Sequence, residues 1–264
     1  MSSTLTERAG SSDVESAARP APDPRHPVGT VLVTGAASGL GRAVAVAVAG
    51  AGGRPLLVDR VDPRVRAAAT PREAGLADAP TAVVDLADTR TAERAVAELA
   101  ARAGGLDAVV AAAGTDSCGR LADVPAEEWD RVIRVNLLGT AAVIRAALPH
   151  LRESRGRIVT VASTLGLRAL SDASAYCASK FGVIGLSRAL AVELAGEVGL
   201  TTLIPGGMNT AFFDGRTEQY KPGPDAQLND PADVADAVLF ALTRPRGCEV
   251  RELVVCPATE PSWP

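Results

Sequence analysis

The chain contains 264 residues, a length that suits one α/β domain with a sizeable core. It has 27 lysine and arginine residues against 31 aspartate and glutamate residues, which gives a net charge of −4 at pH 7. This slightly acidic balance includes no long basic run, so we expect no nucleic-acid partner and no membrane partner. We expect no apolar stretch of the sequence to be long enough to span a bilayer.

The cysteines and histidines give no sign of a metal site. The four cysteines are scattered without Cys-x-x-Cys spacing, at Cys118, Cys177, Cys248 and Cys256. The two histidines, His26 and His150, lie far apart in the sequence. We therefore expect no metal and no disulfide framework, and reduced cysteines favour a cytoplasmic enzyme.

The beginning of the chain differs in composition from the rest. Residues 1–27 are rich in serine, alanine, proline and charge, and they lack the apolar segment of a secretory signal. We predict that they form a disordered N-terminal arm. Residues 28–264 are then expected to form a single domain.

The folded part begins with a β-branched run at residues 28–33, which predicts a strand. Residues 34–41 contain three glycines, and an alanine- and valine-rich helix is predicted from 42 to 51. A glycine turn between a strand and a helix is typical of dinucleotide sites, because glycine lets the backbone approach a pyrophosphate at the helix N-terminus. The pattern therefore predicts a nucleotide cofactor.

A second strand is predicted at residues 54–58, and Asp59 follows it directly. A carboxylate roughly 20 residues beyond the glycine turn is placed to accept the hydroxyls of the adenosine ribose. The same carboxylate would repel a 2′-phosphate, so NAD is favoured over NADP. Arg60 could pair with such a phosphate, but we rank the repulsion by Asp59 above it.

Strands and helices continue to alternate along the chain. Further strands are predicted at residues 81–84, 157–162, 201–204 and 249–255, and residues 107–114 are predicted to form a strand with the turn that follows it. Helices are predicted at residues 89–103, 125–151, 171–198 and 231–243, the last capped by Asp230. This order predicts an α/β fold, a doubly wound, Rossmann-like parallel sheet of about seven strands with helices on both faces.

The residues that most suggest chemistry are Tyr176 and Lys180, which lie one helical turn apart on the same face. A nearby ammonium lowers the pKa of a phenol, which suits the tyrosine to proton transfer. Ser163 follows an apolar run and is placed to hydrogen-bond the same oxygen. The pair alone is common by chance, and more often marks an exposed amphipathic helix.

Together these residues resemble the short-chain dehydrogenase/reductase family over roughly residues 28–255. The motifs that carry the resemblance are the cofactor turn Thr34-Gly35-x-x-x-Gly39-x-Gly41, the adenine-side acid Asp85, the tetrad Asn136, Ser163, Tyr176 and Lys180, and the nicotinamide segment Pro205-Gly206-x-x-x-Thr210. The resemblance implies that Tyr176 exchanges a proton with the substrate oxygen, which Ser163 polarises. It also implies that Lys180 lowers the pKa of Tyr176 and binds the nicotinamide ribose, and that Asn136 holds a water that links Lys180 to solvent.

The resemblance further implies which residues contact the cofactor. They are Thr34, Gly35, Ala37, Ser38, Gly39, Leu40, Gly41, Asp59, Arg60, Asp85, Leu86, Ala112, Ala113, Gly114, Tyr176, Lys180, Pro205, Gly206, Met208 and Thr210. One departure is that Ala111-Ala112-Ala113-Gly114 replaces the usual Asn-Asn-Ala-Gly of the family. In the family those asparagines mainly brace the sheet. The resemblance therefore implies that their replacement affects stability or the fit of the cofactor, and not the chemical step.

We therefore expect an NAD(H)-dependent oxidoreductase that interconverts a small secondary alcohol and a ketone. The alternatives are an NADPH-dependent carbonyl reductase of 3-oxoacyl type, a catalytically silent NAD-binding protein, and a dehydratase or epimerase on the same fold. Candidate pocket residues are 115–118, 164–167 and a lid at 207–220, whose apolar walls are Phe212, Phe213 and Tyr220. Asp214 and Arg216 fit solvated loop charges better than substrate ligands, and Trp263 could pack on a neighbouring subunit or close over the site.

The resemblance implies a homo-oligomer, a homotetramer or a homodimer, built partly from the helices around Asn136 and Tyr176. In residues 141–148 and 178–194, small residues alternate with larger apolar ones over much of each helix surface. A surface helix of a monomer normally shows a wider polar face, so we expect a second subunit to cover them.

Overall fold

The computed structural model describes residues 28–66 and 73–263, so the predicted arm at 1–27 lies outside the described residues. A seven-stranded parallel sheet forms the centre, in the order β3-β2-β1-β4-β5-β6-β7. The strands are β1 (Thr30–Thr34), β2 (Arg54–Asp59), β3 (Thr81–Val83), β4 (Ala108–Ala111), β5 (Arg157–Val161), β6 (Gly199–Pro205) and β7 (Glu252–Val255). The predicted doubly wound sheet is confirmed, because the chain winds from β1 outward to β3 and then in the other direction to β7.

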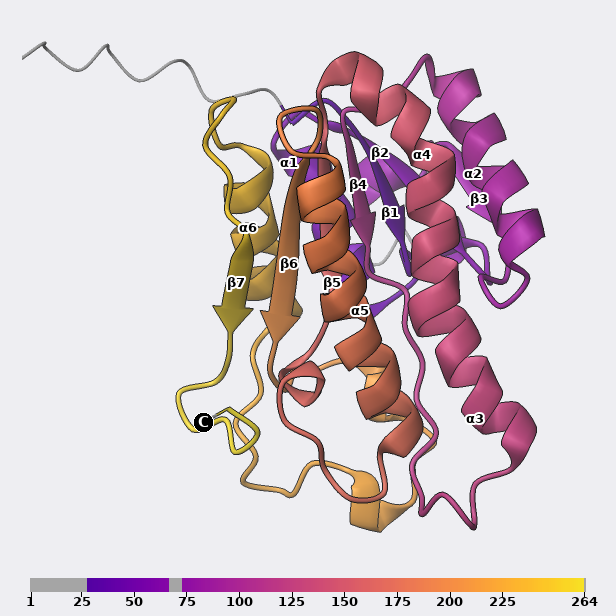
Figure 1. The fold of residues 1–264 in the computed structure, drawn as a ribbon, viewed down its shortest axis with the longest axis vertical. Coiled ribbons are helices and arrows are strands. Elements are labelled where there is room, and N and C mark those ends of the chain that lie inside the picture. The colour runs from indigo at the N-terminus through magenta and orange to yellow at the C-terminus, as the bar shows by residue number, and fades with distance from the viewer. Residues whose placement is uncertain (1–27, 67–72, 264) are drawn as a thin grey trace, which may run out of the picture.

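Helices cover both faces of the sheet and make three layers (Figure 1). They are α1 (Gly39–Gly50), α2 (Thr89–Ala103), α3 (Ala126–Ile133), α4 (Thr140–Ser154), α5 (Ser174–Glu193) and α6 (Pro231–Leu242). Short 3₁₀ turns lie at Pro63–Arg66, Ala74–Leu76, Thr164–Gly166, Ala211–Phe213 and Glu218–Tyr220. Helices α1 and α6 pack together on one face, while α2, α4 and α5 lie on the other.

The strands contribute to two apolar cores, because successive side chains point to opposite faces of a sheet. In β1, Val31 and Val33 belong to the core under α1 and α6, whereas Leu32 belongs to the core under α2 and α4. Every residue of β4 is buried. This double-sided burial explains why β4 reads as an unbroken apolar run and not as an alternating pattern.

The helix predicted at 125–151 has three parts in the structure. Between α3 and α4 lies a π-helical segment, Arg134–Gly139. Gly139 passes so close to Leu86 that an added Cβ would lie 2.9 Å from the leucine Cβ. Asn136 sits within the wider π turn and is only 1% exposed. Single π turns inside helices occur frequently at functional sites.

The same helical stretch, Ala126–Ser154, is long and apolar enough to cross a membrane by length and composition alone. Half of its most apolar window is buried inside the domain, and α4 packs against α2, β4 and β5. A core helix of a globular domain meets the same two criteria, so this finding is weak evidence for a membrane span.

Several predicted boundaries differ from those of the structure. Helix α5 ends at Glu193, well before residue 198, and β6 starts at Gly199 and not at 201. The predicted cap of α6 is confirmed, because Asp230 Oδ1 accepts a hydrogen bond from Ala232 N at 2.8 Å. None of these shifts changes the order of the strands.

The carboxyl ends of the seven parallel strands point to one edge of the sheet, at the bottom of Figure 1. Open α/β sheets bind their ligands outside this edge. The glycine turn follows β1, Ser163 lies just beyond β5, and Gly206 follows β6. The fold therefore brings the three motifs to the same edge.

Candidate active site

The glycine turn after β1 is shaped by close backbone approaches. Gly35 has φ +71°, and an added Cβ there would lie 2.9 Å from the Cα of Ala113. A Cβ on Gly41 would lie 2.3 Å from the carbonyl oxygen of Gly35, so only glycine allows α1 to start this close to the turn. The turn consequently presents bare backbone at the edge of the sheet.

The N-terminus of α1 fits the pyrophosphate of a dinucleotide. Its N-cap residue, Ser38, makes no side-chain hydrogen bond to the helix, and the first turn has no acidic residue. Beside it, Asp59 Oδ2 accepts a hydrogen bond from Ala37 N at 2.9 Å, which fixes a carboxylate next to the turn. Helix N-termini of this kind bind anions through free amide groups and the helix dipole.

Asp85, at the expected adenine side, is also held in place. Its Oδ1 accepts from Ala87 N, and its Oδ2 accepts from the Arg131 guanidinium, both at 2.9 Å. Partial burial disfavours the carboxylate, but these two hydrogen bonds and the charges of Arg131 and Arg60 hold the pKa of Asp85 below its usual value. Arg60 is exposed.

The loop after β4 carries the departure from the family pattern. Ala113 N donates to Thr34 Oγ1 at 3.1 Å, so the threonine of the glycine turn braces this loop. A Cβ added to Gly114 would lie 3.5 Å from Asn136 Oδ1 and 3.7 Å from Lys180 Nζ, which are ordinary contact distances. The loop therefore lies between the glycine turn and the catalytic candidates without the usual asparagines.

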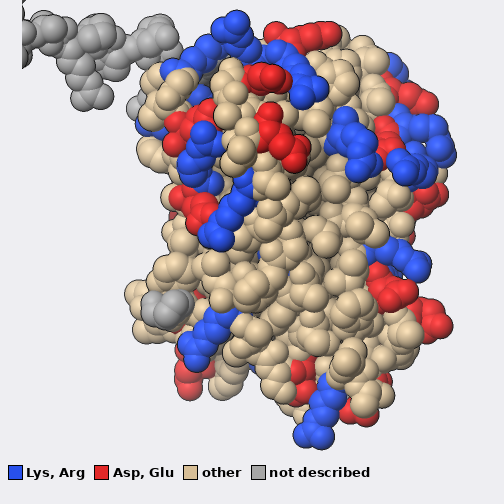
Figure 2. Space-filling view, in the orientation of Figure 1, with Lys and Arg blue, Asp and Glu red and all other residues tan. Residues whose placement is uncertain are grey.

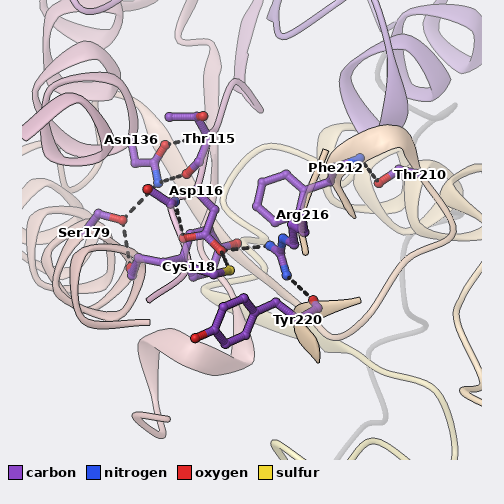
Figure 3. Close-up of polar contacts among 11 residues, drawn as sticks. Thr115, Asp116, Cys118, Asn136, Ser179, Thr210, Phe212, Arg216 and Tyr220 are labelled. Atoms are coloured by element: carbon purple, nitrogen blue, oxygen red, sulfur yellow. Dashed lines mark hydrogen bonds and ion pairs between the residues drawn. The ribbon is translucent and has the colours of Figure 1, made fainter. Parts of the chain in front are cut away.

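Asn136 joins this loop to α5 (Figure 3). Its Oδ1 accepts from Thr115 N at 2.8 Å, and its Nδ2 donates to Thr115 O at 2.9 Å and to Ser179 Oγ at 3.0 Å. Ser179 Oγ in turn donates to the carbonyl of Tyr176 at 2.8 Å. The amide group of Asn136 thus has both of its donors and its acceptor engaged by protein. Its role in a proton relay stays a prediction.

Lys180 is buried one turn after Tyr176, at 4% exposure. Its Nζ donates to the carbonyl of Val161 at 2.8 Å and lies 5.5 Å from the centroid of the Tyr176 ring. Burial lowers the pKa of Lys180 to about 8, and the charge of Asp116 opposes that shift. The ammonium form is therefore still the main one at neutral pH.

Tyr176 lies in the first turn of α5 and is half-buried. Burial raises the pKa of its phenol well above the usual value, and the negative charge of Asp116 adds to that shift. A hydrogen bond with Ser163 and the charge of Arg216 act in the opposite direction. The net increase is opposite to the expected lowering by Lys180, because burial outweighs the Ser163 hydrogen bond and the charge of Arg216.

A buried ion pair closes the other side of the site, and the sequence did not reveal it. Arg216 Nη2 lies 2.8 Å from Asp116 Oδ2, with side chains that are 17% and 7% exposed. The guanidinium carbon is also 4.9 Å and 4.8 Å from the ring centroids of Phe212 and Phe213. Arg216 is consequently neither a solvated loop charge nor a free ligand. It joins the loop after β4 to the lid, as Figure 3 shows.

The Asp116 carboxylate also accepts a hydrogen bond from the thiol of Cys118 at 3.2 Å. Partial burial and the neighbouring Asp116 charge raise the pKa of Cys118 to about 11. A thiol with so high a pKa carries little thiolate at neutral pH, so it is a poor nucleophile. Among the residues that the structure describes, no group of three or more His, Cys, Asp and Glu side chains could hold a metal ion.

The segment after β6 spans the site from the glycine turn to Tyr176. A Cβ added to Gly39 would lie 3.4 Å from the side chain of Thr210. Two residues later, the ring of Phe212 lies 5.6 Å from the Tyr176 ring. The structure therefore brings the glycine turn, the candidate tetrad and the end of β6 into one site.

A family model described as short chain dehydrogenase matches residues 29–221. The chain belongs to this family. An uncharacterized oxidoreductase of Staphylococcus aureus is 35% identical over 232 residues, which cover 86% of this chain and 96% of that protein. Carveol dehydrogenase from Mycobacterium avium in complex with NAD aligns with a TM-score of 0.74 and 28% identity, over 88% of this chain and 97% of that one. An alcohol dehydrogenase from the archaeon Thermococcus sibiricus complexed with 5-hydroxy-NADP aligns with a TM-score of 0.74 and 25% identity, over 86% and 95%.

This short-chain dehydrogenase is therefore an oxidoreductase of a family in which both NAD and NADP-type cofactors are found in similar structures. Sequence reasoning pointed to all four tetrad positions, which the fold brings to one edge of the sheet. It named residues 115–118 only as pocket candidates, and it did not predict that Thr115 and Ser179 hold Asn136 or that Asp116 pairs with Arg216. The position of Thr115 and Asp116 just after the fourth strand was the signal that placed them in the pocket, and it carries no information about their partners.

Proposed function

We propose that this short-chain dehydrogenase interconverts a secondary alcohol and a ketone with NAD(H). One observation carries the proposal: Ser163 directly follows β5, Lys180 lies one turn after Tyr176 with its Nζ 5.5 Å from the centroid of the Tyr176 ring, and the glycine turn follows β1 at the same edge of the sheet. A serine, a phenol and an ammonium at one point can bind an oxygen and move its proton. The glycine turn and the N-terminus of α1 supply the anion cradle that a dinucleotide needs.

A nicotinamide cofactor, when bound, would supply or accept the hydride. Tyr176 gives a proton to the substrate oxygen in reduction and removes it in oxidation. Ser163 Oγ already accepts from Leu165 N at 3.1 Å, so its own hydroxyl hydrogen remains for an oxygen in the site. Lys180 stabilises negative charge on the tyrosine as the proton leaves, from its anchor on the Val161 carbonyl.

A spectrophotometric screen tests this proposal directly. Secondary alcohols with NAD⁺, and ketones with NADH, are expected to change the NADH absorbance when the protein is added. A protein that binds NADH but turns over none of these compounds would support the catalytically silent alternative. Reaction with NADPH and 3-oxoacyl compounds alone would support the reductase alternative.

The preference for NAD rests on the charges around Asp59. Its carboxylate is fixed beside the glycine turn by the Ala37 amide. Arg42, at the start of α1, is paired with Glu73 at 2.6 Å, with both side chains largely buried, and also donates to the Pro63 carbonyl. A 2′-phosphate would therefore meet a fixed negative charge and an arginine whose charge is already balanced.

Calorimetric titration with NADH and NADPH tests the preference. We expect NADH to bind more tightly than NADPH. In Asp59→Ala, which removes the repulsion, the difference between the two affinities should be smaller. Asp62 lies on the same loop and is paired with Arg64. The control variant Asp62→Ala should leave the difference between the NADH and NADPH affinities unchanged. Equal or tighter binding of NADPH by the unaltered protein would contradict the proposal and indicate that Arg60 controls the site.

We further propose an uncharged substrate with an apolar body. Phe212 and Phe213 wall the site beside Tyr176, and the charge of Arg216 is balanced by Asp116. This ion pair offers no unpaired positive charge that could bind a carboxylate on the substrate. A cyclic ketone should therefore react faster than its carboxylate-bearing analogue, and the reverse order would contradict the proposal.

A homo-oligomer is also proposed, built on the outer faces of α4 and α5. Figure 2 shows few charged side chains over the middle of this face. Leu138, in the π-helical segment before α4, and Phe181 and Val192, in α5, are exposed by 47%, 45% and 79%, and a second subunit would cover such apolar side chains. Sedimentation at micromolar concentration should show a dimer or tetramer, and Phe181→Lys should weaken it. A clean monomer would contradict the proposal.

A further inference from the structure

The segment that follows β7, residues 256–263, folds back onto the active-site edge, and we call it the tail. Its central residue is Glu260. Glu260 Oε2 accepts a hydrogen bond from Gly207 N at 2.7 Å, while Oε1 accepts from the amide of Ser262 at 3.1 Å and from its hydroxyl. The tail thus reaches Gly207, just after β6, through the Glu260 carboxylate.

The position of the Glu260 carboxylate explains why residue 206 is a glycine. A Cβ added to Gly206 would lie 2.3 Å from Glu260 Oε2. Partial burial disfavours the carboxylate, but the hydrogen bonds from Ser262 and Gly207 hold the pKa of Glu260 below its usual value. The side chain is therefore ionised at neutral pH, and its bonds to the two amides are charge-assisted.

The tail also reaches the loop that carries the candidate serine. The hydroxyl of Ser262 donates to Glu260, so the Thr164 hydroxyl donates to Ser262 Oγ, at 2.7 Å. Thr164 directly follows Ser163, and both Thr164 and Ser262 are buried. Glu260 and Ser262 consequently connect the end of β5 to the end of β6 on the face where the site lies.

Movement at Gly207 would be passed to the rest of the site. Residues 207–210 run from the Glu260 contact to Thr210, whose side chain lies against Gly39 of the glycine turn. Asn209 N and Asn229 N form backbone hydrogen bonds that keep this segment beside residue 229. Any ligand that extends from the glycine turn to Tyr176 must pass this segment.

From these contacts we infer that Glu260 is a positioning residue, which fixes residues 206–210 against the Ser163 loop so that the nicotinamide end of the cofactor is held in register with Tyr176. This inference rests on the proposed function, because it needs a cofactor that extends from the glycine turn to Tyr176. Glu260 itself would touch neither cofactor nor substrate. Its effect passes through the amide of Gly207.

The competing interpretation is that the tail only stabilises the fold. Comparing the binding of two ligands distinguishes a positioning role from a purely structural one. NADH contains the nicotinamide, whereas ADP-ribose has the same adenine, pyrophosphate and ribose groups without it. In calorimetric titrations, Glu260→Ala is expected to weaken NADH binding about tenfold, as befits lost charge-assisted hydrogen bonds. Its affinity for ADP-ribose should stay within about twofold of that of the unaltered protein.

Thr259→Ala is the matched control. Thr259 lies on the same tail, and its hydroxyl donates to Gln227 at 3.1 Å, away from Gly207. This variant should bind both ligands as the unaltered protein does. Glu260→Gln keeps one acceptor oxygen and should recover part of the NADH affinity. Equal losses for NADH and ADP-ribose, or no loss for either, would overturn the inference.

Hydrogen exchange, measured on the full chain without ligand, tests the contact itself. Glu260→Ala should speed amide exchange in residues 206–210 and 163–166, while Thr259→Ala should not. Unchanged exchange would overturn the inference. If the unaltered protein binds neither NADH nor ADP-ribose, the proposed function fails and cofactor positioning fails with it, but the exchange result still decides whether Glu260 fixes the segment.

Discussion

Two walls of the candidate active site are built in different ways. One wall consists of Asn136, Ser179 and Lys180 on the π turn and on α5. These side chains donate to backbone carbonyls of the loop after β4, of α5 itself and of β5. The other consists of Asp116, Arg216 and the phenylalanines of the lid, and it lies on two loops joined by one ion pair. The first is rigid because helices and strands place it. The second depends on a side-chain contact.

The difference suggests a division of labour. Proton transfer needs fixed geometry, which regular elements supply better than loops do. Substrate choice varies between enzymes of one fold, and loops vary at lower cost to the core. We therefore expect changes in the helical wall to affect chemistry and changes in the loop wall to affect stability and substrate preference.

The largest effect is expected from Tyr176→Phe. The phenol is lost but the ring stays, so the contact with Phe212 and the fold should persist. Turnover should fall by roughly 10²–10⁴-fold, the usual contribution of a positioned acid–base group. NADH affinity measured by calorimetry should remain within about twofold of that of the unaltered protein.

Tyr220→Phe provides the control, since the chain has only 2 tyrosines and Tyr220 lies in the lid. It should keep nearly full turnover. If Tyr176→Phe retained turnover within about tenfold, Tyr176 would not be the acid–base. Similar losses in both variants would indicate that the lid and not the helical wall controls the reaction.

Lys180→Met sharpens the comparison through the pH dependence of stability. The pKa of Lys180 is lowered from 10.5 to about 8 by burial, so the unfolded chain binds more protons than the folded one between these values. The buried ammonium therefore destabilises the fold fully below about pH 8. This destabilisation is removed as the pH rises from about 8 to 10.5, so the free energy of unfolding increases over that range. Each pKa unit is worth about 1.4 kcal/mol, which gives a total of roughly 3 kcal/mol.

Urea unfolding of the unaltered protein and of Lys180→Met across this window measures the effect. The variant cannot titrate at this position, so the free energy of unfolding of the unaltered protein should rise relative to that of the variant. Groups that both proteins share cancel in the difference. A difference that stays constant with pH would show that Lys180 has an ordinary pKa in the folded state.

Breaking the ion pair tests the loop wall. Asp116→Asn or Arg216→Met leaves one charge largely buried without its partner, which should lower the free energy of unfolding by roughly 2 kcal/mol. The double variant should recover most of that loss, because it leaves no unpaired charge, and the difference gives the coupling energy of the pair. Turnover of a good substrate should fall less than in Tyr176→Phe.

The lid itself offers a matched exposed pair, Glu218 and Lys221, whose side chains are 88% and 38% exposed. Glu218→Gln should change the free energy of unfolding by less than about 0.5 kcal/mol, since solvent screens such pairs. If it cost as much as Asp116→Asn, the burial of the Asp116–Arg216 pair would have no special effect.

These two walls also show what sequence can predict. Tyr176 and Lys180 are one helical turn apart, so local spacing alone predicts that they share a face. The glycine turn is recognised by the strand and helix beside it. Asp116 and Arg216 are 100 positions apart, and Gly207 is 53 from Glu260, so these contacts arise only when the chain folds. The π turn at Asn136 had no sequence signal either, and the close approach of Gly139 to Leu86 within it appears only in the folded chain.

A smaller effect on turnover than that of Tyr176→Phe is expected to distinguish two serines of α5 that are bonded in the same way. Ser179 Oγ accepts from Asn136 and donates to the Tyr176 carbonyl, while Ser187 Oγ accepts from Thr160 and donates to the Val183 carbonyl. Both residues are fully buried. Replacing either with alanine leaves one donor without its acceptor, so each change should cost about 1 kcal/mol of stability.

Only Ser179→Ala should affect catalysis, because only Ser179 connects Asn136 to the turn that carries Tyr176. Asn136 keeps its two bonds to Thr115, so the geometry loosens without collapsing, and kcat should fall by about threefold to tenfold. Measuring kcat and the urea midpoint for both variants separates the two effects. Equal losses of kcat would mean that the helical wall responds to stability alone, and that the hydrogen bonds around Asn136 have no particular part in the placement of Tyr176.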